Sequence, residues 1–282
     1  MSAPGERPSW ARRFAKALLP RRVRRALRIA AREAPHRWRD WPADLSDALG
    51  ASGGGRLPPA NLRRRVSRTS SRREFEDVGR RIAADVLGAF RRSAETGVSY
   101  LRWLDFGCGA GRISRHLLGA PEIGALVGVD VDGALVAWAR KHLPRGEFRR
   151  IDPAPPASFP DRSFDAAVVV SIFTHFDEKM GRRWAADLAR MLRPGGLMIV
   201  STHAPSIAGS IPLAPEARER LHAAGFLFVP GNGVFNDDAA FHSVGYLKRE
   251  WAPWFDLLEH AEHGLVGYQD LSVWRRRAAS AT

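Results

Sequence analysis

Three glycines within five residues, in the stretch WLDFGCGAGRISRHLL at 103–118, constrain this chain more than any other feature. An apolar run ends in Asp105, and Gly107, Gly109 and Gly111 follow at alternate positions before a helical pattern begins. Glycine reaches positive φ angles without strain and lets a ligand approach the backbone closely. The start of the following helix also offers unpaired N–H groups. The stretch therefore predicts a strand, turn and helix that bind a nucleotide-containing cofactor.

The spacing of the glycines argues against a dinucleotide cofactor. Read from Gly107, the fingerprint G-x-G-x-x-G requires glycine at position 112, where this chain has Arg112. Read from Gly109, it requires glycine at position 114, where this chain has Ser114. The dinucleotide interpretation fails in both registers.

A second acid, Asp130, ends the next apolar run and lies 19 residues after Gly111. A carboxylate at this point of an α/β fold can accept hydrogen bonds from two ribose hydroxyls. The alternative is that the glycines form only a tight turn and Asp130 caps a helix. Asp132 is the better candidate for a plain helix cap, because it immediately precedes the next helical pattern.

From residue 100 onward, strand and helix patterns alternate. Helical patterns, such as GRISRHLLG at 111–119, lie between the strand patterns, and RPGG closes the last of these helices. The strand patterns are YLRWLDFG at 100–107, ALVGVDVD at 125–132, GEFRRID at 146–152, SFDAAVVVSIFTH at 163–175 and LMIVSTH at 197–203. This alternation predicts an α/β fold, a Rossmann-like doubly wound and mostly parallel sheet with helices on both faces. The last segment reads as a helix followed by two strand patterns, which predicts an antiparallel C-terminal strand.

These motifs resemble those of the class I S-adenosylmethionine-dependent methyltransferases over roughly residues 100–205. LDFGCGAGR is similar to the family's first motif, whose glycine loop cradles the methionine part of the cofactor, and VGVDVD to the second, whose acid binds the ribose. FPDRSFDAAVVVSIFTH is similar to the family's fourth strand, and LARMLRPGGLMIVSTH to its next helix, turn and fifth strand. FHSVGYLKREWAPWF with GLVGYQDLSVWRR resembles a bacterial subgroup associated with small-molecule or surface-glycan biosynthesis.

The resemblance implies a methyltransferase that uses S-adenosyl-L-methionine. An acid at the position of Asp105 helps to hold the amino group of that cofactor in the family, directly or through water. The resemblance implies cofactor binding by Asp105, Gly107, Cys108, Gly109, Gly111, Asp130, Val131, Asp152 and Ser171. The loop RRIDPAPPASFPD departs from the family pattern near the adenine, because three prolines interrupt it. Ile151, Asp152 and Phe159 are the candidates for contact with the adenine.

Methyl transfer from a sulfonium is an in-line displacement, in which much of the acceleration can come from proximity and orientation. A hydroxyl acceptor also benefits from a general base, and histidine has a suitable pKa. His175 and His203 follow the carboxyl ends of predicted strands, where doubly wound sheets bind ligands, and His242 is a third candidate. The alternative for each histidine is that it packs or forms hydrogen bonds within its own loop.

Several other chemistries lack their motifs. The tetrad [ND]-P-P-[YFW], common where an amino group of a base or glutamine is methylated, is replaced by SIFT at 171–174. Cytosine C5 methylation needs a cysteine nucleophile, and the sole cysteine, Cys108, lies in the glycine loop as a small residue. No cluster of histidine and acidic residues has the spacing of a metal site, so no catalytic metal is expected.

The excess of positive charge lies near the N-terminus. Residues 1–100 hold 23 Lys and Arg against 10 Asp and Glu, whereas residues 101–282 hold 21 against 20. We divide the chain into a basic helical N-terminal extension and linker at 1–60 and a catalytic domain at 61–282. Three interpretations of residues 1–50 remain open: a helical extension packed on the domain, a membrane-surface anchor, or a nucleic-acid-binding arm.

The sequence predicts a cytoplasmic methyltransferase, with peripheral contact to a membrane as one interpretation of its basic arm. Its apolar runs are too short to span a bilayer, and its N-terminus lacks the apolar core of a signal peptide. The expected acceptor is a small molecule, lipid or glycan that is methylated at oxygen. Two alternatives are an RNA methyltransferase that uses the basic arm and a non-catalytic protein that only binds the cofactor.

Overall fold

The computed structural model describes residues 57–95, 101–210, 213–231 and 238–278. These residues all belong to one compact unit that begins at Gly54. The helices expected within residues 1–50 lie outside the described residues. Within the described part of the chain, no helix is both long enough and apolar enough to cross a membrane.

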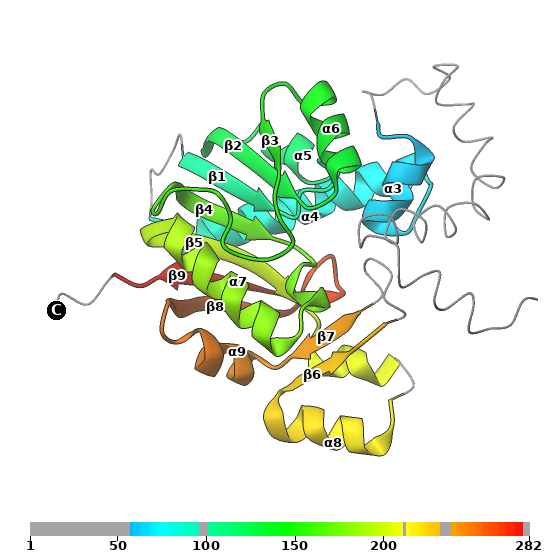
Figure 1. The fold of residues 1–282 in the computed structure, drawn as a ribbon, viewed down its shortest axis with the longest axis vertical. Coiled ribbons are helices and arrows are strands. Elements are labelled where there is room, and N and C mark those ends of the chain that lie inside the picture. The colour runs from blue at the N-terminus through cyan, green and yellow to red at the C-terminus, as the bar shows by residue number, and fades with distance from the viewer. Residues whose placement is uncertain (1–56, 96–100, 211–212, 232–237, 279–282) are drawn as a thin grey trace, which may run out of the picture. The chain divides into compact units, whose positions relative to one another are not determined.

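A seven-stranded sheet forms the centre of this unit, in the order β3–β2–β1–β4–β5–β9–β8 (Figure 1). The first five of these strands are parallel, whereas β9 pairs antiparallel with both β5 and β8. The strands are β1 (Leu101–Phe106), β2 (Ile123–Asp130), β3 (Glu147–Arg150), β4 (Phe164–Val169), β5 (Leu192–Thr202), β8 (Phe255–Leu265) and β9 (Gln269–Arg276). The predicted Rossmann-like sheet and its antiparallel C-terminal strand are confirmed. The strand order reverses between β1 and β4, and open α/β sheets bind ligands at such a point.

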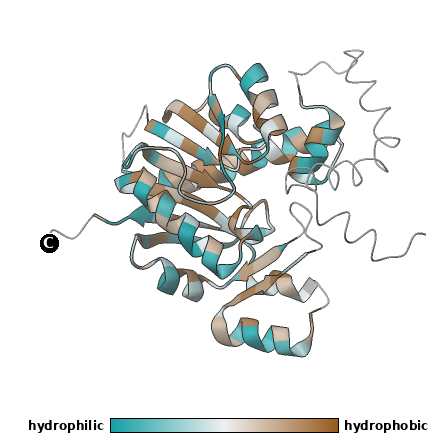
Figure 2. Cartoon of the chain, in the orientation of Figure 1, coloured by the Kyte–Doolittle hydropathy of each residue, from teal (hydrophilic) through white to brown (hydrophobic). Residues whose placement is uncertain are grey.

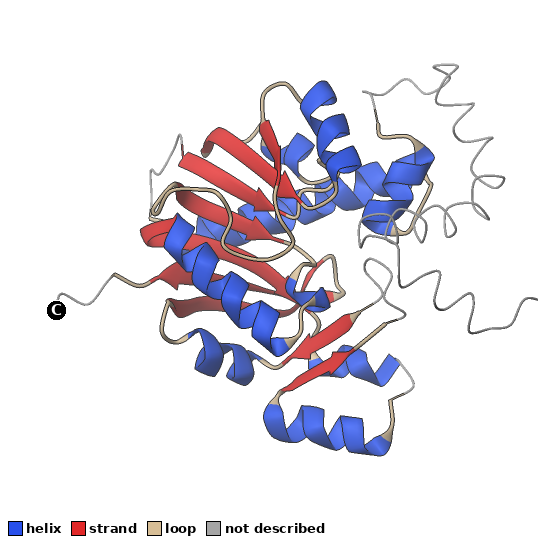
Figure 3. Cartoon of the chain, in the orientation of Figure 1, coloured by secondary structure: helices blue, strands red, loops and turns tan. Residues whose placement is uncertain are grey.

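Helices cover both faces of the sheet (Figure 3). One face is packed by α4 (Arg72–Ser93), α5 (Ser114–Leu117) and α6 (Gly133–His142), and the other by α7 (Glu178–Met191) and α9 (Val244–Trp251). The helix starts follow from the local sequence, because side chains there accept the first unpaired N–H groups. Ser71 accepts the N–H of Glu74 at the start of α4, and Asp177 accepts that of Met180 at the start of α7.

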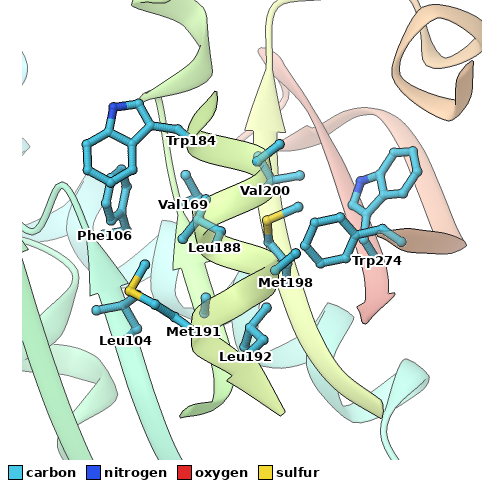
Figure 4. Close-up of a cluster of buried hydrophobic side chains, with 14 of the residues drawn as sticks. Leu104, Phe106, Val169, Trp184, Leu188, Met191, Leu192, Met198, Val200 and Trp274 are labelled. Atoms are coloured by element: carbon cyan, nitrogen blue, oxygen red, sulfur yellow. The ribbon is translucent and has the colours of Figure 1, made fainter. Parts of the chain in front are cut away.

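Two apolar layers, one on each face of the sheet, make the core. The strands are mostly hydrophobic, while the outer faces of the helices are hydrophilic (Figure 2). Trp184 and Leu188 of α7 lie against side chains of β1, β4 and β5 (Figure 4). The rings of Trp184 and Phe106 are 4.8 Å apart in an edge-on arrangement. This packing fixes the strand ends that carry the site.

Two sequence expectations need correction. The helix expected at 111–119 is only the four-residue α5, because Gly119 and Pro121 follow it and favour a turn over a longer helix. The strand expected at 197–203 begins at Leu192, so the RPGG stretch belongs to β5 instead of separating it from the helix. A shift in the β4–β5 register accommodates the extra residues, and Gly195 there has a φ of 80°.

Other elements were not expected from the sequence at all. The short helix α3 (Ala60–Ser67) precedes α4. Between β5 and α9 the chain forms a 3-10 helix η2 (Pro205–Ser210), helix α8 (Pro215–Ala224) and an antiparallel hairpin of β6 (Phe226–Val229) and β7 (Ala239–His242). This insertion has its own small apolar cluster and touches the central sheet through β7.

Candidate cofactor and acceptor site

The glycine loop connects β1 to α5 and has a backbone shape that suits glycine. Gly107, Gly109 and Gly111 have φ angles of 85°, 55° and 74°. The N–H groups of Gly107 and Cys108 donate to the carbonyl of Val129 in β2, at 2.8 and 3.0 Å. A Cβ atom at Gly107 would lie 2.1 Å from Cδ1 of Ile172, just after β4. The loop is thus tied to β2 and lies against the end of β4.

Asp130 ends β2 and holds the loop through its carboxylate. Its Oδ2 accepts the N–H of Gly109 at 2.9 Å, and its Oδ1 accepts the N–H of Asp132 at 2.8 Å. Burial raises the pKa of Asp130 above its usual value, while these two hydrogen bonds act against the rise. Each carboxylate oxygen keeps a second lone pair, so Asp130 can still accept two ligand hydroxyls.

Asp105 lies beneath the loop and is 2% exposed. The hydroxyl of Ser114 donates to its Oδ2 at 2.5 Å. Burial raises the pKa of Asp105 to about 6, and the hydrogen bond from Ser114 opposes part of this rise. At pH 7 the carboxyl is therefore mostly ionised. The charge of Arg112 also acts to lower this pKa, but the described residues show no ion pair between Arg112 and Asp105, so the carboxylate can still bind a ligand ammonium group.

The remaining cofactor candidates from the sequence occupy different surroundings. Cys108 is buried, and burial raises the pKa of its thiol well above the usual value, so it is not a nucleophile at neutral pH. The carbonyl of Val131 accepts a hydrogen bond from Arg150 at 3.2 Å. Asp152 is exposed after β3. Phe159, an adenine candidate, is buried and packs edge-on against Phe164.

Helix α3 lies over the glycine loop, a feature that the sequence did not indicate. A Cβ atom at Gly109 would lie 3.0 Å from Cγ2 of Val66. Arg65 forms an ion pair with Asp132. Asp132 also caps α6 by accepting the N–H groups of Ala134 and Leu135, which confirms the expectation that it is a helix cap. Helix α3 therefore covers the glycine loop.

The three histidine candidates lie near one another around β7. His175 ends the 3-10 helix η1 (Phe173–His175), and its Nδ1 lies 2.7 Å from the backbone carbonyl of Asp238. His203 follows β5, and its carbonyl accepts the N–H of His242 at 2.8 Å. Burial lowers the pKa of His203 to about 4, and the nearby charges of His175 and Arg68 act in the same direction. His203 is therefore neutral at pH 7.

His242 does not lie at the edge of the site. It is 4% exposed and packs against the rings of Phe226 and Tyr246, at 5.1 and 5.9 Å between centroids. Burial lowers the pKa of His242 to about 3, with a smaller contribution from His203. Of the three histidines, His175 and His203 are the ones that follow the carboxyl ends of the parallel strands β4 and β5.

Sequence reasoning missed two polar residues of this region, Ser201 and Gln269. Ser171, a cofactor candidate, has a φ of 57° and donates its N–H to Oγ of Ser201 at 2.9 Å. The hydroxyls of both serines lie within 3.0 Å of Oε1 of Gln269, at the start of β9. Gln269 is far from both serines in the sequence, and no local motif marks it. The one signal is that Gln269 is a polar residue at the start of a strand, and it is 7% exposed.

Comparisons with known proteins agree with this arrangement. A family model described as a methyltransferase domain matches residues 104–196. The trans-aconitate 2-methyltransferase of Methylobacterium nodulans is 31% identical over 222 residues, which cover 72% of this chain and 75% of that enzyme. The ubiquinone biosynthesis O-methyltransferase of Parvibaculum lavamentivorans is 32% identical over 122 residues, which cover 39% of this chain and 46% of that enzyme.

Solved structures show the same fold. The S-adenosylmethionine-dependent methyltransferase of Mesorhizobium loti superposes with a TM-score of 0.51 at 20% identity, over 68% of this chain and 98% of that one. The glycine loop, the acid after β2 and the sheet order define a methyltransferase of the Rossmann-like type. The chain belongs to the class I S-adenosylmethionine-dependent methyltransferase family, and its cofactor is S-adenosyl-L-methionine.

The residues of the site fit this cofactor. The positive φ angles of Gly107, Gly109 and Gly111 form a loop without side chains at these three positions, whose backbone a ligand can approach closely. The remaining lone pairs of Asp130 suit the two ribose hydroxyls, and the buried carboxylate of Asp105 suits the amino group. The cofactor supplies an electrophilic methyl group on a sulfonium, and the protein has to place an acceptor in line with it.

Proposed function

We propose that this methyltransferase acts at an oxygen atom of a small molecule, lipid or glycan. The observation that carries the proposal is the place of His175 and His203. Both follow the carboxyl ends of neighbouring strands, β4 and β5, and Ile172 joins this edge to the glycine loop. An imidazole here can bind or deprotonate an oxygen nucleophile that approaches the methyl group.

We also propose the cofactor contacts. The glycine loop and Asp105 hold the amino-acid part, Asp130 holds the ribose, and Val131, Asp152 and Ser171 line the rest of the site. The names of the relatives favour oxygen as the acceptor atom, since one is an O-methyltransferase and another acts on trans-aconitate. The stretch after β4 carries no motif for methylation of an amino group.

The test is methyl transfer from cofactor labelled in the methyl group to four pools: carboxylic acids, phenols and alcohols, membrane lipids, and RNA. Mild alkali releases label from methyl esters but not from methyl ethers or N-methyl groups, and NMR of the purified alkali-stable product distinguishes an O-methyl group from an N-methyl group. Label on oxygen supports the proposal. Label on nitrogen, or label that reaches only RNA, refutes it. Asp130→Ala serves as a control that should lower every signal.

A further inference from the structure

Four polar side chains form a hydrogen-bonded network where β4, β5 and β9 meet. The hydroxyls of Ser171 and Ser201 lie 3.0 and 2.7 Å from Oε1 of Gln269. Nε2 of Gln269 lies 3.1 Å from Nε2 of His203. Ser201 and Gln269 are buried, at 0% and 7% exposed. Ser201 and Gln269 are therefore shielded from bulk water, and their polar hydrogen atoms need acceptors within the protein.

The two serines decide which way the Gln269 amide faces. Oγ of Ser201 already accepts the N–H of Ser171, so the hydroxyl proton of Ser201 needs an acceptor of its own. Oε1 of Gln269 has two lone pairs and can accept the protons of both hydroxyls. The reversed amide would leave the buried hydroxyl proton of Ser201 without an acceptor among the described residues, which is unfavourable. The NH2 group of Gln269 therefore faces His203.

The amide in turn decides which nitrogen of His203 carries the proton. An amide N–H can only donate, so Nε2 of His203 accepts it and the proton of the neutral ring lies on Nδ1. Nδ1 is buried and has no hydrogen-bond partner among the described residues. A buried N–H without an acceptor is costly, so this atom calls for a ligand as its partner.

We propose that Gln269 is a positioning residue that holds His203 with its proton on Nδ1, so that His203 offers the acceptor a hydrogen-bond donor and not a base. The attacking oxygen must then already be an anion when it binds. A carboxylate is the oxygen acceptor that meets this condition at neutral pH. The inference rests on the proposed oxygen methylation and adds the chemical class of the acceptor to it.

The reaction balances without a base. A lone pair of one carboxylate oxygen attacks the methyl carbon of the cofactor, the carbon–sulfur bond breaks, and its electron pair stays on sulfur. The products are a methyl ester and S-adenosylhomocysteine, and no proton leaves the acceptor. The second carboxylate oxygen can meanwhile accept the Nδ1–H of His203. An alcohol would have to lose a proton, and Nδ1 in this state has no lone pair to take it.

The charges near His203 also favour an anionic acceptor. Arg68, the residue after α3, and His175 both lie close enough to lower the pKa of His203. The Nδ1–H of His175 donates to the carbonyl of Asp238, so its ring is likewise oriented by a backbone acceptor. A carboxylate placed beside His203 therefore meets a positive side chain and two imidazole rings.

The first test measures the proton directly, before any acceptor is known. Long-range proton–nitrogen NMR on protein labelled with 15N-histidine and saturated with S-adenosylhomocysteine distinguishes Nδ1–H from Nε2–H. The His203→Gln variant identifies the His203 signals. The inference predicts Nδ1–H in the wild type and a change of tautomer or charge in Gln269→Glu, whose carboxylate can only accept. Nε2–H in the wild type would overturn it.

The second test compares two replacements of His203. An asparagine amide nitrogen occupies roughly the place of Nδ1, whereas that of glutamine occupies roughly the place of Nε2. With carboxylic acid acceptors, His203→Asn should stay within about tenfold of wild-type kcat/KM, and His203→Gln should lose about tenfold more, the value of one hydrogen bond to a charged group. His222→Asn, on the exposed side of α8, is the matched control and should leave activity unchanged.

The outcomes separate this inference from the proposed function. Transfer to alcohols but not to carboxylic acids, or an equal loss in both His203 variants, would overturn the inference and leave oxygen methylation standing. Transfer to nitrogen, or to no oxygen acceptor at all, would overturn the proposed function, while the NMR measurement would still decide the role of Gln269.

Discussion

The buried carboxyl of Asp105 should make cofactor affinity depend on pH. Its pKa of about 6 in the folded protein means that it is about 90% ionised at pH 7 and about 10% ionised at pH 5. If the cofactor's ammonium group binds only the ionised form, the apparent Kd rises in inverse proportion to that fraction. Affinity for S-adenosylhomocysteine is therefore expected to fall about tenfold between pH 7 and pH 5.

Calorimetric titration at several pH values measures this dependence. Adenosine, which lacks the amino-acid part, is the control ligand, and it also reports any contribution from protonation of Asp130. Asp105→Asn should bind S-adenosylhomocysteine weakly and with little pH dependence. In Ser114→Ala the midpoint should move to higher pH, because the lost hydrogen bond no longer lowers the pKa of Asp105. An equal fall for both ligands, or no fall in the wild type, would refute the role of Asp105.

Three further substitutions test the geometry. Gly107→Ala places a Cβ 2.1 Å from Ile172 at a φ of 85°. This variant should lose about 1–2 kcal/mol of stability in urea titration and should no longer bind the cofactor tightly. Gly119→Ala, which has open space around it, is the control and should show neither effect. Asp132→Ala removes the cap of α6 and the ion pair to α3, and should lower stability by about 1–2 kcal/mol; an unchanged melting temperature would refute this. Trp184→Ala, in the core and 1% exposed, should cost about 3–5 kcal/mol.

The sequence was sufficient for the parts of the fold that local patterns determine. The glycine spacing, the acid at Asp130 and the alternating apolar runs led to the central sheet, its parallel order and its antiparallel end. The type of each element, its tight turns and its helix caps depend mainly on residues that are neighbours in the sequence, so local patterns can predict them. The helix cap at Asp132 was predicted for the same reason and is confirmed.

The remaining parts depend on contacts between distant residues. The sequence ANLRRRVS at 60–67 has too short an apolar stripe to mark a helix, and α3 is held by its contacts with the glycine loop and Asp132. The strands β6 and β7 have four residues each, which is too short a run to show a clear alternating pattern in the sequence. Gln269 reaches Ser201 across 68 residues of sequence, through strand pairing that no local pattern shows. The pKa values of His203 and His242 follow from burial, which sequence reasoning could not supply.

The most direct test of the cofactor site is a calorimetric titration of the full chain with S-adenosylhomocysteine, beside Asp130→Ala and with NAD as the control ligand. Asp161→Ala, a surface position, is the matched control variant. We predict micromolar binding by the wild type, no binding of NAD, and a loss of about 1–3 kcal/mol in Asp130→Ala, the cost of unpaired buried polar groups. A folded wild type that fails to bind S-adenosylhomocysteine, or an Asp130→Ala variant that binds it equally well, would contradict the site described here.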